Sequence, residues 1–159
     1  MAITFKYKSI KRPGGNIVKT PSIPITLHGN SEINIEVIAL LDTGADLSVI
    51  PQDIAELLNI DLTGEKDKSR GIGGEVNIIN TKISINLKKG HESYDFEIPV
   101  QVILGDGKIP VILGRKGFFD KFKITFDQAN EKVSLKRHTR LNYWIKNLYT
   151  NYLHFNKIR

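Results

Sequence analysis

Cysteine is absent from the 159 residues of the chain. Its absence excludes a thiol nucleophile, cysteine metal ligands and disulfide bonds from any site or core. The four histidines are scattered, at positions 28, 91, 138 and 154, and show no metal-ligand spacing. We therefore expect no bound metal and no cofactor.

Long hydrophobic runs are also missing. Charged residues interrupt every apolar segment well before the roughly 18 residues that a membrane-spanning helix needs. The segment from Met1 to Lys8 alternates apolar and polar side chains and lacks the apolar stretch of a signal peptide. The sequence therefore predicts no membrane span and a cytoplasmic location.

Acidic residues do not occur after Glu131, and the C-terminal part contributes strongly to the net charge of +6. Apolar residues there recur at helical spacing: Leu141, Trp144, Ile145, Leu148, Tyr152 and Phe155. The sequence thus predicts a domain of residues 1–137 and a basic amphipathic C-terminal helix of residues 138–159. We expect this helix to dock on the domain or on a second copy of the chain. A helix that binds a membrane surface or nucleic acid is the less favoured alternative.

Short segments that alternate apolar and polar residues between turn signals make up most of the remaining chain, which is strand patterning. Prolines at positions 21 and 24 indicate that the strand containing them lies at a sheet edge or follows an irregular path. We expect a short helix at 51–58 and a helical turn at 118–122. The expected strands are 3–10, 33–41, 94–104, 111–113, 123–127 and 132–136, and residues 76–87 contain two alternating runs. The predicted fold class is all-β.

The triplet Asp42-Thr43-Gly44 stands where a buried strand breaks into a turn. On its own it has a simple structural interpretation, in which the Asp42 side chain accepts hydrogen bonds from backbone amides two residues on. Four apolar residues, 38–41, precede it directly, so the carboxylate lies at the edge of a core, where a lone charge is costly.

Paired carboxylates offer a chemical reason for that placement. If two copies of the chain pair about a twofold axis, two Asp42 side chains meet and share a proton, because both cannot ionise at close range. One carboxylate then acts as a base on water while its protonated partner polarises a carbonyl group.

Three motifs together resemble the retropepsins, the dimeric aspartic proteases of retroviruses and their cellular relatives. Residues 39–50 resemble the active-site segment, residues 71–74 the tip of the flap, and residues 111–115 the third signature. They occur in the family's order, and the resemblance covers roughly residues 23–136. It implies a closed β barrel, the half of an acid protease, with short helices.

The resemblance also implies roles for individual residues. Asp42, Thr43 and Gly44 would form the catalytic loop, with Thr43 bonding across the dimer axis and Gly44 admitting the substrate backbone. Asp46 would bind substrate amides and pair with Arg115, whose planar guanidinium suits a bidentate contact. Further substrate contacts are expected from Ala45, Gly71, Ile72, Gly73 and Ile112, with Ile72 closing over the substrate.

The sequence therefore predicts a homodimeric aspartic endopeptidase that acts on a peptide or protein substrate. A dimeric module that keeps the fold and binds peptides without hydrolysis is the alternative. The charged residues beside the flap tip, Arg70 and Glu75, depart from viral relatives and argue against viral-like cleavage preferences. A nucleic-acid contact through the basic tail is not favoured but stays open.

Overall fold

The computed structural model describes residues 2–11, 14–30, 32–71, 74–105 and 109–138. The predicted C-terminal helix lies outside these residues. Within the described part of the chain, no helix has the length and hydropathy of a membrane span. The elements are β1 (Ala2–Lys6), β2 (Lys8–Lys11), β3 (Ile17–Thr20), β4 (Ser22–His28), β5 (Asn34–Leu41), β6 (Ser48–Pro51), α1 (Gln52–Leu57), β7 (Lys66–Gly71), β8 (Gly74–Lys89), β9 (Glu92–Ile103), β10 (Ile112–Leu113), the 3₁₀ turn η1 (Phe119–Lys121), β11 (Phe122–Asp127) and β12 (Lys132–Arg137).

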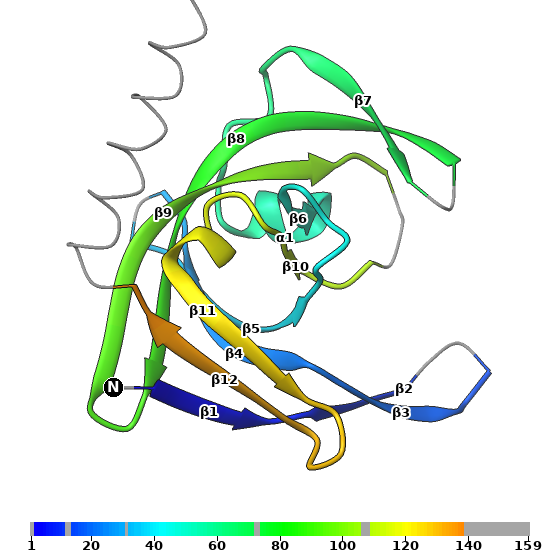
Figure 1. Ribbon diagram of the computed structural model, residues 1–159. Coiled ribbons are helices and arrows are strands. Elements are labelled where there is room, and N and C mark those ends of the chain that lie inside the picture. Colours follow the sequence, from blue (N-terminus) through cyan, green and yellow to red (C-terminus); the bar gives the residue numbers. More distant parts are fainter. Residues whose placement is uncertain (1, 12–13, 31, 72–73, 106–108, 139–159) are drawn as a thin grey trace, which may run out of the picture.

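A seven-stranded sheet forms the body of the domain, in the order β4-β5-β10-β6-β9-β8-β7. Residues Thr26–His28 at the end of β4 also pair with β8, so the sheet curls until it closes on itself (Figure 1). Closure pairs the edge formed by β4 and encloses a core of aliphatic side chains, while β7 lies outside the ring as an edge strand. The all-β prediction and the closed barrel are confirmed.

Pro24 limits where β4 can pair with β8 to close the barrel. Along its whole length β4 pairs with β5, and Pro24 lies opposite Ile38. The pairing with β8 begins only at Thr26, beyond the proline, which has no N–H to donate. The expectation of an edge strand therefore holds for the first half of β4 and is wrong for the second half.

The hairpin of β8 and β9 is the longest element of the barrel, with 16 and 12 residues. The sequence suggested two separate alternating runs in residues 76–87. The structure has one strand, because the polar residues Asn80 and Thr81 continue the ladder opposite Gln101 and Val100. Gly90 turns the chain with a positive φ of 60°, a conformation that suits glycine.

A second, three-stranded sheet has the order β1-β12-β11 and joins the N-terminal strand to the last described strand (Figure 1). The single strand expected over residues 3–10 is wrong. The chain leaves the sheet at the buried Tyr7, whose N–H donates to the Glu131 carbonyl at 2.8 Å, and continues into the β2–β3 hairpin.

Aromatic side chains fill the space between the two sheets. Phe118, which is fully buried, lies 5.4 Å from Phe122 and 6.0 Å from Phe96 between ring centroids. Tyr94 meets Phe122 edge to face at 5.6 Å. Such contacts stabilise a core beyond the area that they bury. They fix η1 and the loop that precedes it against the barrel.

Candidate active-site loops

Asp42 follows β5 directly and is held at the end of a parallel strand pair. β10 pairs with β5, Leu113 lying opposite Leu41, and β10 also pairs with β6 on its other side. The Asp42 N–H donates to the Leu113 carbonyl at 3.1 Å. The buried strand end therefore presents the carboxylate at the surface, where Asp42 is partly exposed.

The Asp42 side chain shapes its own loop. Its Oδ1 accepts the N–H of Gly44 at 2.8 Å, and its carbonyl accepts the N–H of Ala45 at 3.3 Å. The turn interpretation from the sequence is thus correct, and it leaves the second carboxylate oxygen without a hydrogen bond among the described residues. Thr43 and Gly44 are exposed. A methyl group on Gly44 would lie 3.2 Å from Asp42 Oδ1, so glycine keeps this turn tight.

A second loop, residues 114–116, is bound to the first by its backbone. The N–H groups of Arg115 and Lys116 donate to the carbonyls of Ala45 and Asp46, at 2.9 and 2.8 Å. The Arg115 guanidinium forms an ion pair and a hydrogen bond with the Asp46 carboxylate. Both side chains are more than half exposed, at 58% and 83%. The structure therefore forms the Asp46–Arg115 pair that the sequence suggested, and it forms it at the surface.

Two residues that the sequence analysis did not single out join these loops. Ser48 is buried, and its hydroxyl accepts the N–H of Gly114 at 3.1 Å. A Cβ on Gly114 would lie 2.4 Å from the carbonyl carbon and oxygen of Leu47, so no other residue fits without movement of the backbone. A glycine directly after a buried strand was the available signal for this close approach.

Ile112 lies on β10 between β5 and β6, opposite Leu40 and Val49, and is partly buried. The remaining predicted contacts belong to the predicted flap. Gly71 ends β7 and pairs with Gly74, which begins β8 with a φ of 110°. Ile72 and Gly73 lie outside the described residues.

Lys68, Arg70 and Glu75 carry charges on β7 and β8, beside the predicted flap tip. Lys68 forms an ion pair with Glu75 at 2.7 Å, and Arg70 lies opposite Glu75 in the ladder. Ser69, on the other face of β7, donates a hydrogen bond to Gln101 of β9 at 3.3 Å. This contact links β7 to the barrel wall.

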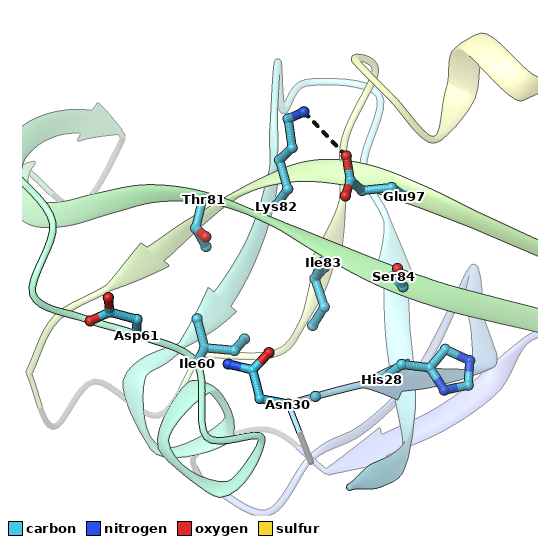
Figure 2. A pocket seen from close by; sticks show the side chains of 10 residues that line it. His28, Asn30, Ile60, Asp61, Thr81, Lys82, Ile83, Ser84 and Glu97 are labelled. Atoms are coloured by element: carbon cyan, nitrogen blue, oxygen red, sulfur yellow. Dashed lines mark ion pairs between the residues drawn. The ribbon is translucent and has the colours of Figure 1, made fainter. Parts of the chain in front are cut away.

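A polar cavity of about 350 Å³ lies elsewhere, between β8, β9 and the turn after β4 (Figure 2). Lys82 and Glu97 form an ion pair of 3.2 Å at its wall, and Asp61, in the segment after α1, is among its lining residues. Hydrogen bonds from the Thr63 hydroxyl and N–H hold the pKa of Asp61 below its usual value. None of the predicted site residues lines this cavity.

Comparison with known proteins agrees with this geometry. The model of a family described as aspartyl protease matches residues 23–116, more than half of the chain. No curated protein matches the sequence. The chain is similar to a solved retropepsin-like aspartic protease from Rickettsia conorii, with 20% identity, a TM-score of 0.55, and coverage of 85% of this chain and 98% of that chain.

Two further solved structures are similar. The protease of EIAV, complexed with the inhibitor HBY-793, is 31% identical over 61% of this chain and 83% of that chain, with a TM-score of 0.42. The retroviral protease-like domain of Ddi1 from Leishmania major is 18% identical over 77% of this chain and 96% of that chain, with a TM-score of 0.47. On the family match and the fold, the chain belongs to the aspartyl protease family, as a retropepsin-like member.

Proposed function

We propose that the protein is an aspartic endopeptidase that works as a homodimer, with one Asp42 from each subunit. The observation that carries this proposal is the Asp42 loop. One carboxylate oxygen is held by Gly44 N–H, and the carboxylate is presented at the surface on a loop that a second loop supports. One chain supplies one such loop, so a second copy is needed to complete a carboxylate pair.

In the proposed reaction the two Asp42 carboxylates share one proton across the twofold axis. The ionised carboxylate takes a proton from water, and the water oxygen attacks the carbonyl carbon of the peptide. The protonated carboxylate donates to the carbonyl oxygen as it becomes negative. Collapse of the tetrahedral intermediate breaks the C–N bond. The leaving nitrogen takes the proton that the first carboxylate accepted from water, and a hydroxyl group of the intermediate returns a proton to the second carboxylate, which restores the shared proton.

The loops around Asp42 suggest where the substrate backbone lies. Gly44 carries no side chain that would block an approaching strand, and Ala45 and Asp46 follow in the same exposed loop. The Asp46–Arg115 pair would position this loop, while residues 71–74 would cover the substrate from the flap. Ile112 would contribute an apolar contact below it.

Incubation of the purified protein with a mixed peptide library, from mildly acidic to neutral pH, tests the proposal. Cleavage should be blocked by an aspartic-protease inhibitor and by Asp42→Asn. Specific activity should fall on dilution, in parallel with dissociation of the dimer in sedimentation experiments. A fully active monomer would refute the shared site. Peptide binding by the parent protein without any cleavage would favour the non-catalytic module.

A further inference from the structure

Charge is distributed unevenly between the middle and the ends of the chain. Residues 1–31 contain five lysines and arginines and no acid, and residues 132–159 contain seven and no acid. All 17 acids and the other 11 basic residues lie in residues 32–131. The excess of basic residues is therefore not confined to the C-terminal part. The N-terminal part is also basic, and the fold places it beside β12.

The β1-β12-β11 sheet brings these two basic ends together. One face of the sheet is buried and holds Ile3, Phe5, Val133 and Leu135. The register of the three strands places three rows of residues on the outer face, which are Ala2-Lys136-Lys123, Thr4-Ser134-Thr125 and Lys6-Lys132-Asp127. The Thr4 and Ser134 hydroxyls are hydrogen bonded at 2.7 Å. The outer face thus carries hydroxyls along its middle and lysines on both sides.

The lysines of this face are unfavourably placed for the free protein. Lys6 lies directly opposite Lys132, and Lys123 directly opposite Lys136. Like charges at such cross-strand positions are destabilising. None of the ion pairs formed among the described residues includes any of these four lysines. The one acid of the face, Asp127, lies opposite Lys132 and accepts hydrogen bonds from the N–H and side-chain amide of Asn130 in its own turn, so it offsets only one of the four lysines.

We propose that the outer face of the β1-β12-β11 sheet binds the phosphate backbone of double-stranded nucleic acid. Four exposed lysines and three hydroxyl groups are donors suited to phosphate oxygens. Lys132 and Lys136 are four residues apart on a strand, or about 14 Å, a length over which a duplex presents about eight charges. In Figure 1 this sheet lies at the lower left and β7 at the upper right, so the body of the barrel separates the sheet from β7.

The composition of the face distinguishes this partner from others. Its rows hold no apolar side chain larger than that of Ala2, whereas a membrane-binding surface gains affinity from buried apolar area. They hold no aromatic ring on which unpaired bases could stack. Binding through phosphates alone is independent of base sequence and depends steeply on salt.

Fluorescence anisotropy of a short labelled DNA duplex, titrated with the full chain over a range of salt concentrations, tests the proposal. The sheet variant carries Lys6→Gln, Lys123→Gln, Lys132→Gln and Lys136→Gln. The matched tail variant carries Arg140→Gln, Lys146→Gln, Lys157→Gln and Arg159→Gln, an equal change of charge. The slope of log affinity against log salt should become shallower by about 3.6 in the sheet variant, since each lost contact contributes about 0.9. The tail variant should keep the parent's slope.

A gain-of-contact variant keeps the test valid if four substitutions disturb folding. Thr125→Lys adds a charge to the middle row and should steepen the slope by about 0.9. Absence of duplex binding by the parent, an unchanged slope in the sheet variant, or an equal loss in both four-site variants would overturn the proposal. So would tighter binding to vesicles of anionic phospholipid than to the duplex at the same salt concentration.

Discussion

The N–H of Gly114 donates to the buried hydroxyl of Ser48 at 3.1 Å, and this contact joins the start of β6 to the loop that follows β10, 66 residues later in the chain. Ser48→Ala removes the acceptor and leaves the Gly114 N–H unpaired, which should lower the free energy of unfolding by about 1–3 kcal/mol. Chemical denaturation measures the change. Ser84→Ala, at an exposed position of β8, is the control and should change stability by less than about 0.5 kcal/mol.

Gly114→Ala should destabilise the same junction by a different mechanism. The added Cβ would overlap the Leu47 carbonyl, and the two loops would have to separate, at a cost of about 1–3 kcal/mol or more. Gly64→Ala is the matched control, because its Cβ would meet Ile79 at an ordinary 3.4 Å. Equal melting temperatures for the two variants would contradict the close approach of the loops.

Asp42→Asn should reduce peptide hydrolysis by a factor of about 10² to 10⁴, the usual contribution of a general base. The asparagine side-chain oxygen can still accept the Gly44 N–H, so the loop should keep its conformation. The variant should also pair at least as well as the parent, since it removes repulsion between two carboxylates. Sedimentation and circular dichroism check assembly and folding, and Asp53→Asn on the exposed face of α1 is the control.

Arg115→Lys keeps the positive charge but loses the planar fork that contacts Asp46. Because both side chains are mostly exposed, the pair contributes at most about 1 kcal/mol to stability. We therefore expect nearly unchanged unfolding but weaker activity or dimerisation. A double-mutant cycle with Asp46→Asn separates the pair from the effects of either residue alone. Additive effects on activity would show that the pair does not act as a unit.

The turn between β11 and β12 should lose stability at acidic pH. Hydrogen bonds from the Asn130 side chain and backbone, with a smaller effect of the Lys132 charge, lower the pKa of Asp127. The stabilisation is present above the unfolded-state pKa of about 3.9 and is lost as the pH falls through the lower folded-state pKa. Carboxylate NMR titration should show that Asn130→Ala raises the pKa of Asp127 and leaves that of Asp61 low.

A chain that ends at His138 tests the proposed division into a domain of residues 1–137 and a C-terminal helix. If residues 138–159 dock on the domain or on a second copy, the shortened chain should show a lower melting temperature or weaker dimerisation. An unchanged melting temperature and dimer equilibrium would contradict docking.

Several parts of the site could be predicted because local sequence determines them. The four apolar residues 38–41 followed by Asp42-Thr43-Gly44 specify a buried strand that ends in a turn, and the structure has that turn. The Asp46–Arg115 pair came from the family resemblance, since no local pattern places residues 69 positions apart in contact. Ser48 and Gly114 were missed for the same physical reason, because a contact between two loops leaves no periodic signal.

The fold class could be predicted from the sequence, but the pairing of the strands could be predicted only in part. Alternation marked most strands, but it did not show that β4 reaches β8 or that residues 76–87 belong to one strand. The alternation of apolar and polar residues also continues through Tyr7, although strand β1 ends before it and the Tyr7 N–H donates to the Glu131 carbonyl. Where a strand ends and which strand it pairs with depend on hydrogen bonds between residues distant in sequence. The local preferences of neighbouring residues do not predict these hydrogen bonds.

The pairing of β1 with β12 has a consequence for how the protein folds during synthesis. Ile3 of β1 has its partner Leu135 in β12, 132 residues later in the chain. The buried side of β1 therefore has no sheet to join until almost the whole domain has been translated. Contacts so distant in sequence make folding slow and leave an unpaired strand exposed in the nascent chain. Pairing of β1 with β12 is thus a late step in the folding of the domain, because it must wait until β12 has been made.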